Sequence, residues 1–303
     1  MRLFTLLLLA VFFSCSKSKT SECNYITDYY QTIYAADYAF ETKDYQKALH
    51  LYQTAFNSCD PITTLAYNEI ANFAETTAVL KKYDLTFEFA AKLILSGSEL
   101  SRLQNNTNFD EFMASKYGKQ LEAEYGDLRQ QFMDRIDLDL RTEIISMMRA
   151  DQMYRIQGPE ADWAKQDSID KLHEAILIDW FETIGYPNDD MVGPYSLDFN
   201  QTNVGIFLLH TDDSIRMNYF VPKVKEFVAQ GKASPYTLGT MIDQYYLYNK
   251  KPQIYGTYSQ QGGGYADMIA DLKKVDSNRI SIGLPPLALK EKKDSINRIK
   301  YGL

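Results

Sequence analysis

Small and aromatic residues recur at helical spacing between residues 25 and 57, and this pattern constrains the fold more than any other part of the chain. Alanines stand at positions where two antiparallel helices must approach closely, and tyrosines stand where the gap between them must be filled. The positions are Ala35, Ala36, Ala39, Tyr45, Ala48, Tyr52 and Ala55. Pro61 follows the second helix. The pattern therefore predicts a helix, a turn and a second helix.

This pattern resembles a tetratricopeptide repeat. A second, degenerate copy has residues 63–80 as its first helix and residues 85–96 as its second, with Tyr83 and Asp84 in place of Asp44 and Tyr45. The resemblance implies a surface that binds a protein or peptide partner. The alternative is a helical platform that only supports the rest of the chain.

The remaining sequence also favours helices. A polar break at residues 104–108 precedes expected helices over 109–117, 128–157, 162–184, 196–209, 222–230 and 235–249. Residues 253–259 form the best strand candidate and run into three glycines at 262–264. We therefore predict a mainly α fold, in which tetratricopeptide-like hairpins (23–103) are followed by a compact helical domain with a short β-hairpin (109–303).

The first fifteen residues indicate an export signal. Arg2 precedes an apolar run from Leu3 to Phe13, and Ser14 and Cys15 follow. This run of eleven residues is too short for a spanning helix, which needs about 20. We expect a lipoprotein signal over 1–14, lipidation of Cys15 and a flexible tether over 15–22. Such a protein is anchored in the bacterial cell envelope, and we expect the outer membrane, facing the periplasm.

Charge and cysteine content agree with that location. The chain has 40 acidic and 32 basic side chains, a balance that argues against nucleic acid as a partner. After Cys15 only Cys23 and Cys59 remain, at the two ends of the first predicted hairpin. A disulfide between them fits an oxidising compartment, and two separate buried thiols are the alternative.

Motifs in the second half resemble a bacterial protein family of unknown function. Its pattern is matched by Asp151-Gln152-x-x-Arg155, Gly185-Tyr186-Pro187, Val192-Gly193, His210-x-Asp212, the segment 251–257 and Arg279-x-x-x-Gly283-Leu284-x-Pro286-Leu287. The chain departs from that pattern at three polar positions: Leu209, Gln244 and Tyr258. The resemblance implies a shared fold and site, but no reaction.

Polar residues of these motifs are the site candidates. His210, with Asp243 or Tyr255, is suited to general acid–base catalysis. The ligand-binding candidates are Asp151, Arg155, Asp212, Gln253 and Arg279. For each residue alone, a structural role such as a helix cap or an ion pair is the alternative. We expect no metal site and no cofactor, because three dispersed histidines and no phosphate-binding loop are present.

Tyrosine is abundant, with 23 residues, and six of them cluster between positions 245 and 265. Such rings suit a glycan or cell-wall fragment as ligand, although half-buried core is the commoner role. We therefore predict a lipid-anchored module that binds or scaffolds a protein or cell-wall ligand. The alternatives are a hydrolase-like enzyme centred on His210 and a structural accessory without a pocket.

Overall fold

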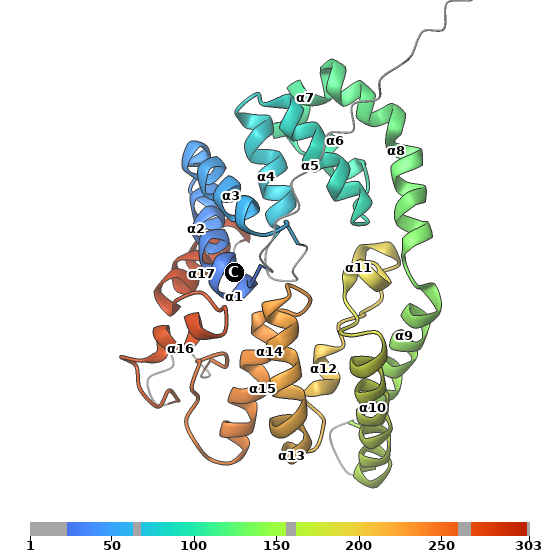
Figure 1. Ribbon diagram of the computed structural model, residues 1–303, viewed down its shortest axis with the longest axis vertical. Coiled ribbons are helices and arrows are strands. Elements are labelled where there is room, and N and C mark those ends of the chain that lie inside the picture. Colours follow the sequence, from blue (N-terminus) through green and yellow to red (C-terminus); the bar gives the residue numbers. More distant parts are fainter. Residues whose placement is uncertain (1–22, 63–67, 156–161, 260–267, 302–303) are drawn as a thin grey trace, which may run out of the picture.

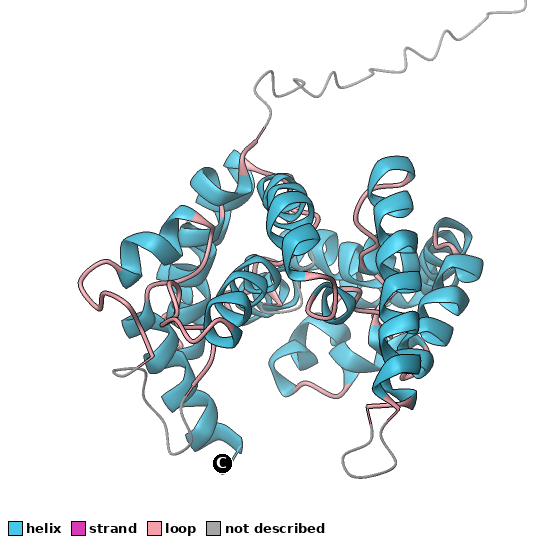
Figure 2. Ribbon diagram, turned by 90° about the horizontal axis from the view of Figure 1, so that it is seen from below, coloured by secondary structure: helices cyan, strands magenta, loops and turns pink. Residues whose placement is uncertain are grey.

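The computed structural model describes residues 23–62, 68–155, 162–259 and 268–301. These residues form a mainly helical protein, and no β-strand is present among them (Figures 1 and 2). The predicted helical fold class is therefore confirmed. The expected lipidation site, Cys15, lies outside the described residues. None of the described helices combines the length and the apolar character that crossing a membrane requires.

The first half begins with two helical hairpins. Their helices are α1 (Tyr25–Asp28), α2 (Tyr30–Glu41), α3 (Tyr45–Ser58), α4 (Glu69–Val79) and α5 (Tyr83–Leu95). α2 packs along α3 and α4 along α5, while α3 contacts α4. Ala36, Ala48 and Ala55 are fully buried, as close helix packing requires. A disulfide joins Cys23 and Cys59, whose Cα atoms are 5.5 Å apart.

The two hairpins have the same turn between their helices. Lys43 and Lys81 adopt left-handed backbone conformations, with φ of 60° and 56°. In both turns the next N–H donates to the carbonyl five residues back at 2.9 Å, the bond of a Schellman helix end. The shared turn pairs Tyr83 with Tyr45. The pairing of Tyr83 with Asp44 expected from the sequence is therefore off by one residue.

A bent helical segment connects the halves. It comprises α6 (Ser101–Gln104), η1 (Thr107–Phe109), α7 (Asp110–Ala114), α8 (Lys116–Arg135) and α9 (Leu138–Met153). The single helix expected over 128–157 is wrong, because the chain breaks between α8 and α9. Asp137 causes the break: its carboxylate accepts the N–H of Leu140 at 2.8 Å and so begins α9 as an N-cap.

The second half contains short helices between longer ones. They are α10 (Trp163–Thr183), α11 (Asp189–Val192), η2 (Tyr195–Leu197), α12 (Gly205–Leu208), α13 (Asp213–Ile215), the π-helical η3 (Arg216–Phe220), α14 (Val221–Ala229), α15 (Pro235–Tyr248), α16 (Val275–Ser281) and α17 (Leu287–Tyr301). The helix expected over 196–209 is mostly absent. Asp198 and Asn203 accept backbone N–H groups two residues ahead, which favours turns over a helix.

The predicted strand is a loop. Gln253 forms one isolated parallel bridge with Ile269, and the segment that follows it is irregular. The three glycines at 262–264 lie outside the described residues. The expected β-hairpin is therefore not confirmed.

The last helices return to the first ones. α17 packs on α2, and α1 contacts both α14 and α16, so the red and blue ends of the chain lie side by side (Figure 1). The hydroxyl of Tyr34 donates to the carbonyl of Gly283 at 2.7 Å, and Gln31 donates to that of Leu284 at 2.9 Å. One hydrophobic core extends from Tyr25 to Leu284. The two regions expected from the sequence thus share a core.

Candidate functional site

Asp151 and His210 form the hydrogen-bonded pair best suited to proton transfer. Asp151 lies near the end of α9 with 1% of its surface exposed, and its Oδ1 is 2.8 Å from Nδ1 of His210. Burial opposes ionisation of Asp151, but His210 and Arg155 outweigh it, so the pKa of Asp151 is lowered. An ionised Asp151 accepts a hydrogen bond from an Nδ1–H of His210, and this tautomer leaves Nε2 as the ring atom that can accept a proton. The His210 side chain is 21% exposed.

Two polar residues of α10 complete this cluster. Asp170 pairs with Nη2 of Arg155 at 2.6 Å and accepts a hydrogen bond from Gln166 at 2.8 Å. Arg155 also lies 3.7 Å from Asp151. The sequence analysis did not name Asp170 or Gln166. Their spacing of four residues places them on one helix face, and that was the signal available to find them.

The cluster does not fit a cation well, although its geometry is compact. Ligand atoms of Asp151, Asp170 and His210 lie within 4.8 Å of one another. However, Arg155 contributes a positive charge between the two carboxylates, and Gln152 and Gln166 donate hydrogen bonds to them. A divalent cation would have to displace these donors. The arrangement is a hydrogen-bonded network that orients His210.

Asp243 performs a structural task. It is fully buried, and its two carboxylate oxygens accept four hydrogen bonds of 2.8–3.0 Å from Ile254, Tyr255 and Thr257. Gln253 adds a reciprocal pair of 2.8 Å bonds with the backbone of Tyr258. Together they fix the loop that follows α15, because an irregular buried backbone needs side-chain partners.

Arg279 holds the other side of that loop. Its guanidinium donates to the carbonyl of Tyr255 at 2.7 Å and to that of Pro285. Burial, followed by the charge of Asp243, raises the pKa of Tyr255. Among the described residues, no hydrogen bond or ion pair links His210 to Asp243, Tyr255, Gln253 or Arg279. The structure thus gives His210 the partner Asp151 in place of the expected Asp243 or Tyr255.

Asp212 is a helix cap. Its Oδ1 accepts the N–H groups of Ser214 at 2.8 Å and Ile215 at 3.3 Å, which begins α13. Its own N–H donates to Glu174 of α10 at 2.8 Å. These contacts position the segment that carries His210.

Arg216 connects two of the positions where the chain departs from the family pattern. Its buried guanidinium donates to the backbone carbonyl of Leu209 at 2.8 Å and to the side chain of Gln244 at 2.9 Å. It also donates to the carbonyl of Thr211 at 2.6 Å. Arg216 therefore fixes the backbone on both sides of His210.

A cavity of about 290 Å³ lies between the hairpins and the second half of the chain. It is lined from one side by α4, α5 and α6 and from the other by α11 and η2, and we call it the interface cavity. Its polar lining includes Asn68, Ser96, Ser98, Arg102, Asp189 and Ser196. Burial lowers the pKa of Arg102, and the charge of Glu75 opposes that effect. The sequence analysis named neither Arg102 nor Asp189.

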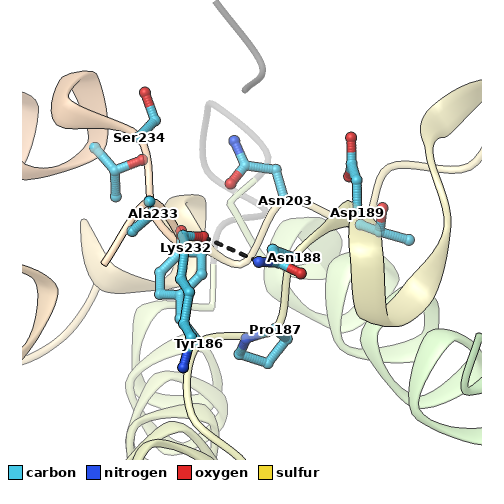
Figure 3. Close-up of a pocket in the computed structure, with 11 residues that line it drawn as sticks. Tyr186, Pro187, Asn188, Asp189, Asn203, Lys232, Ala233 and Ser234 are labelled. Atoms are coloured by element: carbon cyan, nitrogen blue, oxygen red, sulfur yellow. Dashed lines mark hydrogen bonds between the residues drawn. The ribbon is translucent and has the colours of Figure 1, made fainter. Parts of the chain in front are cut away.

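Asp189 separates the interface cavity from a pocket of about 30 Å³ on its other side. Figure 3 shows this pocket, where the side chains of Asn203, Ser234 and Asp189 point to the same side and Asn188 donates to the carbonyl of Lys232 at 3.3 Å. Burial and then the charge of Asp190 raise the pKa of Asp189 to about 6. A perturbed carboxyl group beside a cavity is typical of functional sites.

Two further cavities are open to solvent. One of about 370 Å³ lies between α12 and α15, and one of about 550 Å³ lies between the hairpins and α17. His210 lines none of these four cavities, and the same holds for the described tyrosines of the 245–265 cluster. Tyr265 lies outside the described residues.

Comparison of the chain with protein family models, with curated proteins and with solved structures finds no match.

Proposed function

We propose that this protein is a lipid-anchored envelope module that binds a peptide or cell-wall fragment in the interface cavity. In this proposal residues 1–14 are removed, Cys15 carries the lipid, and residues 15–22 tether the helical body to the outer membrane on its periplasmic side. The disulfide between Cys23 and Cys59 supports an oxidising compartment. The shared turn at Lys43 and Lys81 supports tetratricopeptide-like hairpins.

The observation that carries the proposal is that one cationic side chain and two acidic side chains, one of them Glu69, line one cavity. Arg102 and Asp189 both line the interface cavity, and Tyr195 adds an aromatic ring that is 49% exposed. A guanidinium recognises a ligand carboxylate, and a nearby carboxyl group recognises an ammonium or hydroxyl group. Aromatic rings cover sugar or peptide surfaces. Peptides and cell-wall fragments combine these groups.

The test is binding of short peptides with free termini and of enzymatically released cell-wall fragments, measured by calorimetry. We expect Arg102→Glu to weaken binding at least tenfold, because it places a like charge opposite the ligand carboxylate. Arg149→Glu on the exposed face of α9 is the matched control and should bind as the unmodified protein does. Equal binding by both variants would contradict the proposal.

The His210–Asp151 pair supports a second candidate, hydrolysis by general base catalysis. Nε2 of His210 would take a proton from a water molecule whose oxygen attacks the scissile bond of the substrate, while Asp151 stabilises the resulting imidazolium. The imidazolium would then return the proton to the leaving group as that bond breaks. We expect His210→Ala to abolish turnover of a cell-wall fragment without changing its affinity for the interface cavity. Unchanged turnover in His210→Ala would exclude this candidate and leave the binding proposal intact.

A further inference from the structure

The C-terminal helix α17 occupies a surface formed by the two hairpins. Lys293 of α17 pairs with Asp37 of α2, and Asp37 also accepts a 2.6 Å hydrogen bond from Asn72 of α4. Asp37 is only 1% exposed. One buried carboxylate thus joins the first helices of both hairpins to α17, which lies beside α2 in Figure 1. We call this surface of α2 and α4 the hairpin groove.

The hairpin groove and α17 are complementary in charge. Asp37, Glu41 and Glu75 place three carboxylates along the groove. The sequence of α17 carries two acidic residues, Glu291 and Asp294, and five basic ones: Lys290, Lys292, Lys293, Arg298 and Lys300. Lys292 also lies over the ring of Tyr38, 6.0 Å from its centroid. Burial raises the pKa of Asp37 and Lys293 opposes that rise, so the lysine favours the ionised form of this buried carboxyl group. An occupant of the groove that supplies a cation can therefore pair with Asp37 as Lys293 does.

α17 fills the groove incompletely. A cavity of about 550 Å³ remains between Phe40 and Tyr45 of the first hairpin and Ile296 and Ile299 of α17. Ile299 is 83% exposed, although apolar groups gain free energy from burial. The last turns of α17 therefore leave the apolar side chain of Ile299 largely uncovered. An occupant with larger apolar residues at these positions would bury more surface than α17 does.

We infer that the hairpin groove is a binding site for a basic amphipathic helix of a protein partner, and that α17 is its displaceable intramolecular occupant. The partner helix must carry a lysine or arginine that reaches Asp37 and apolar residues one and two turns later. α17 and the partner compete, so the groove is partly autoinhibited. This inference is independent of the ligand proposed for the interface cavity, because the two surfaces share none of these residues.

A synthetic peptide of residues 287–301, labelled with fluorescein, is the probe for the groove. The protein with Lys293→Glu should bind this peptide about tenfold more tightly than the unmodified protein, because its own helix leaves the groove more often. Adding Asp37→Asn should abolish that gain, since the peptide lysine then has no carboxylate to meet. Fluorescence anisotropy measures both. Equal affinity in the unmodified and Lys293→Glu proteins would overturn the inference.

A second measurement applies to the unmodified protein and so does not depend on how the variants fold. Hydrogen exchange is followed by mass spectrometry with saturating peptide that carries one heavy-isotope leucine, so that its fragments differ in mass from those of α17. Exchange over 287–301 of the protein should rise, while exchange over α10 should stay unchanged. A peptide with Lys293→Glu is the matched control and should cause no rise. Unchanged exchange with the native peptide would overturn the inference.

Discussion

The aspartates Asp243, Asp151 and Asp189 differ in the groups that donate hydrogen bonds to them. The carboxylate of Asp243 accepts hydrogen bonds from three backbone N–H groups and one hydroxyl group. One oxygen of Asp151 instead forms a hydrogen bond with the partly exposed His210. Asp189 lines two cavities and accepts no hydrogen bond from a described side chain. These differences separate structural from functional candidates better than residue type does.

The first residue-scale prediction concerns Asp243. Replacing it with Ala leaves three partly buried N–H groups without this acceptor, and we expect a loss of about 3 kcal/mol in the free energy of unfolding. Urea denaturation measures the loss. His210→Ala is the control and should cost less, because that side chain is partly exposed. A loss below that of the control would show that the loop has other supports.

The second residue-scale prediction concerns how Asp189 makes the free energy of unfolding depend on pH. Its pKa in the folded protein, about 6, exceeds the unfolded value near 3.9. The folded state therefore binds the proton more tightly, so this group destabilises the fold progressively as pH rises from about 4 to 6. Asp189→Asn should raise the free energy of unfolding at pH 7.5 by about 1–2 kcal/mol and leave it unchanged at pH 3.5. Denaturation at both pH values tests the sign. A gain at pH 3.5 equal to that at pH 7.5 would refute it.

At the scale of elements, turns and helix ends decide how the helices meet. The paired left-handed turns at Lys43 and Lys81 set the two hairpins, and Asp137 divides what periodicity suggests is one helix. Arg141 holds another turn, since it donates at 2.8 Å to the carbonyls of both Val192 and Gly193. Most of the polar motifs quoted from the second half of the chain therefore hold loops in place through hydrogen bonds.

Gly283 supplies the element-scale prediction. It has φ of +89°, and a Cβ at this position would lie 2.8 Å from the ring of Tyr30. Gly283→Ala should lower the free energy of unfolding by about 2 kcal/mol or more, through backbone strain and overpacking. Gly126→Ala in α8 is the matched control. Its added methyl group meets nothing within 4 Å, so thermal melting should show a gain of about 1 kcal/mol or less.

At the scale of the whole molecule, the chain closes on itself. The N-terminal helices contact α14, α16 and α17, so perturbation of the first hairpin spreads to the last helices. The disulfide fixes the ends of that hairpin, 36 residues apart in sequence.

The last prediction therefore concerns this bridge. The double variant Cys23→Ser and Cys59→Ser should lose about 4 kcal/mol of unfolding free energy, because the unfolded chain gains the freedom of an open loop. Denaturant unfolding with and without reductant measures it. Reductant should destabilise the unmodified protein and leave the double variant unchanged. A stability that reductant does not alter in the unmodified protein would contradict this account.

Local physics explains what the sequence determined. Helical spacing and small residues such as Ala36 and Ala48 act within one or two turns, so they predicted the helical class and several helix bounds. The partner of a buried polar group depends on residues far along the chain. Only the tertiary structure brought Asp151 to His210, 59 residues away, assigned Asp243 to the 254–257 loop, and placed Arg102 opposite Asp189 across a cavity. It also decided that α17 covers the first hairpin, because that contact depends on how the whole chain closes.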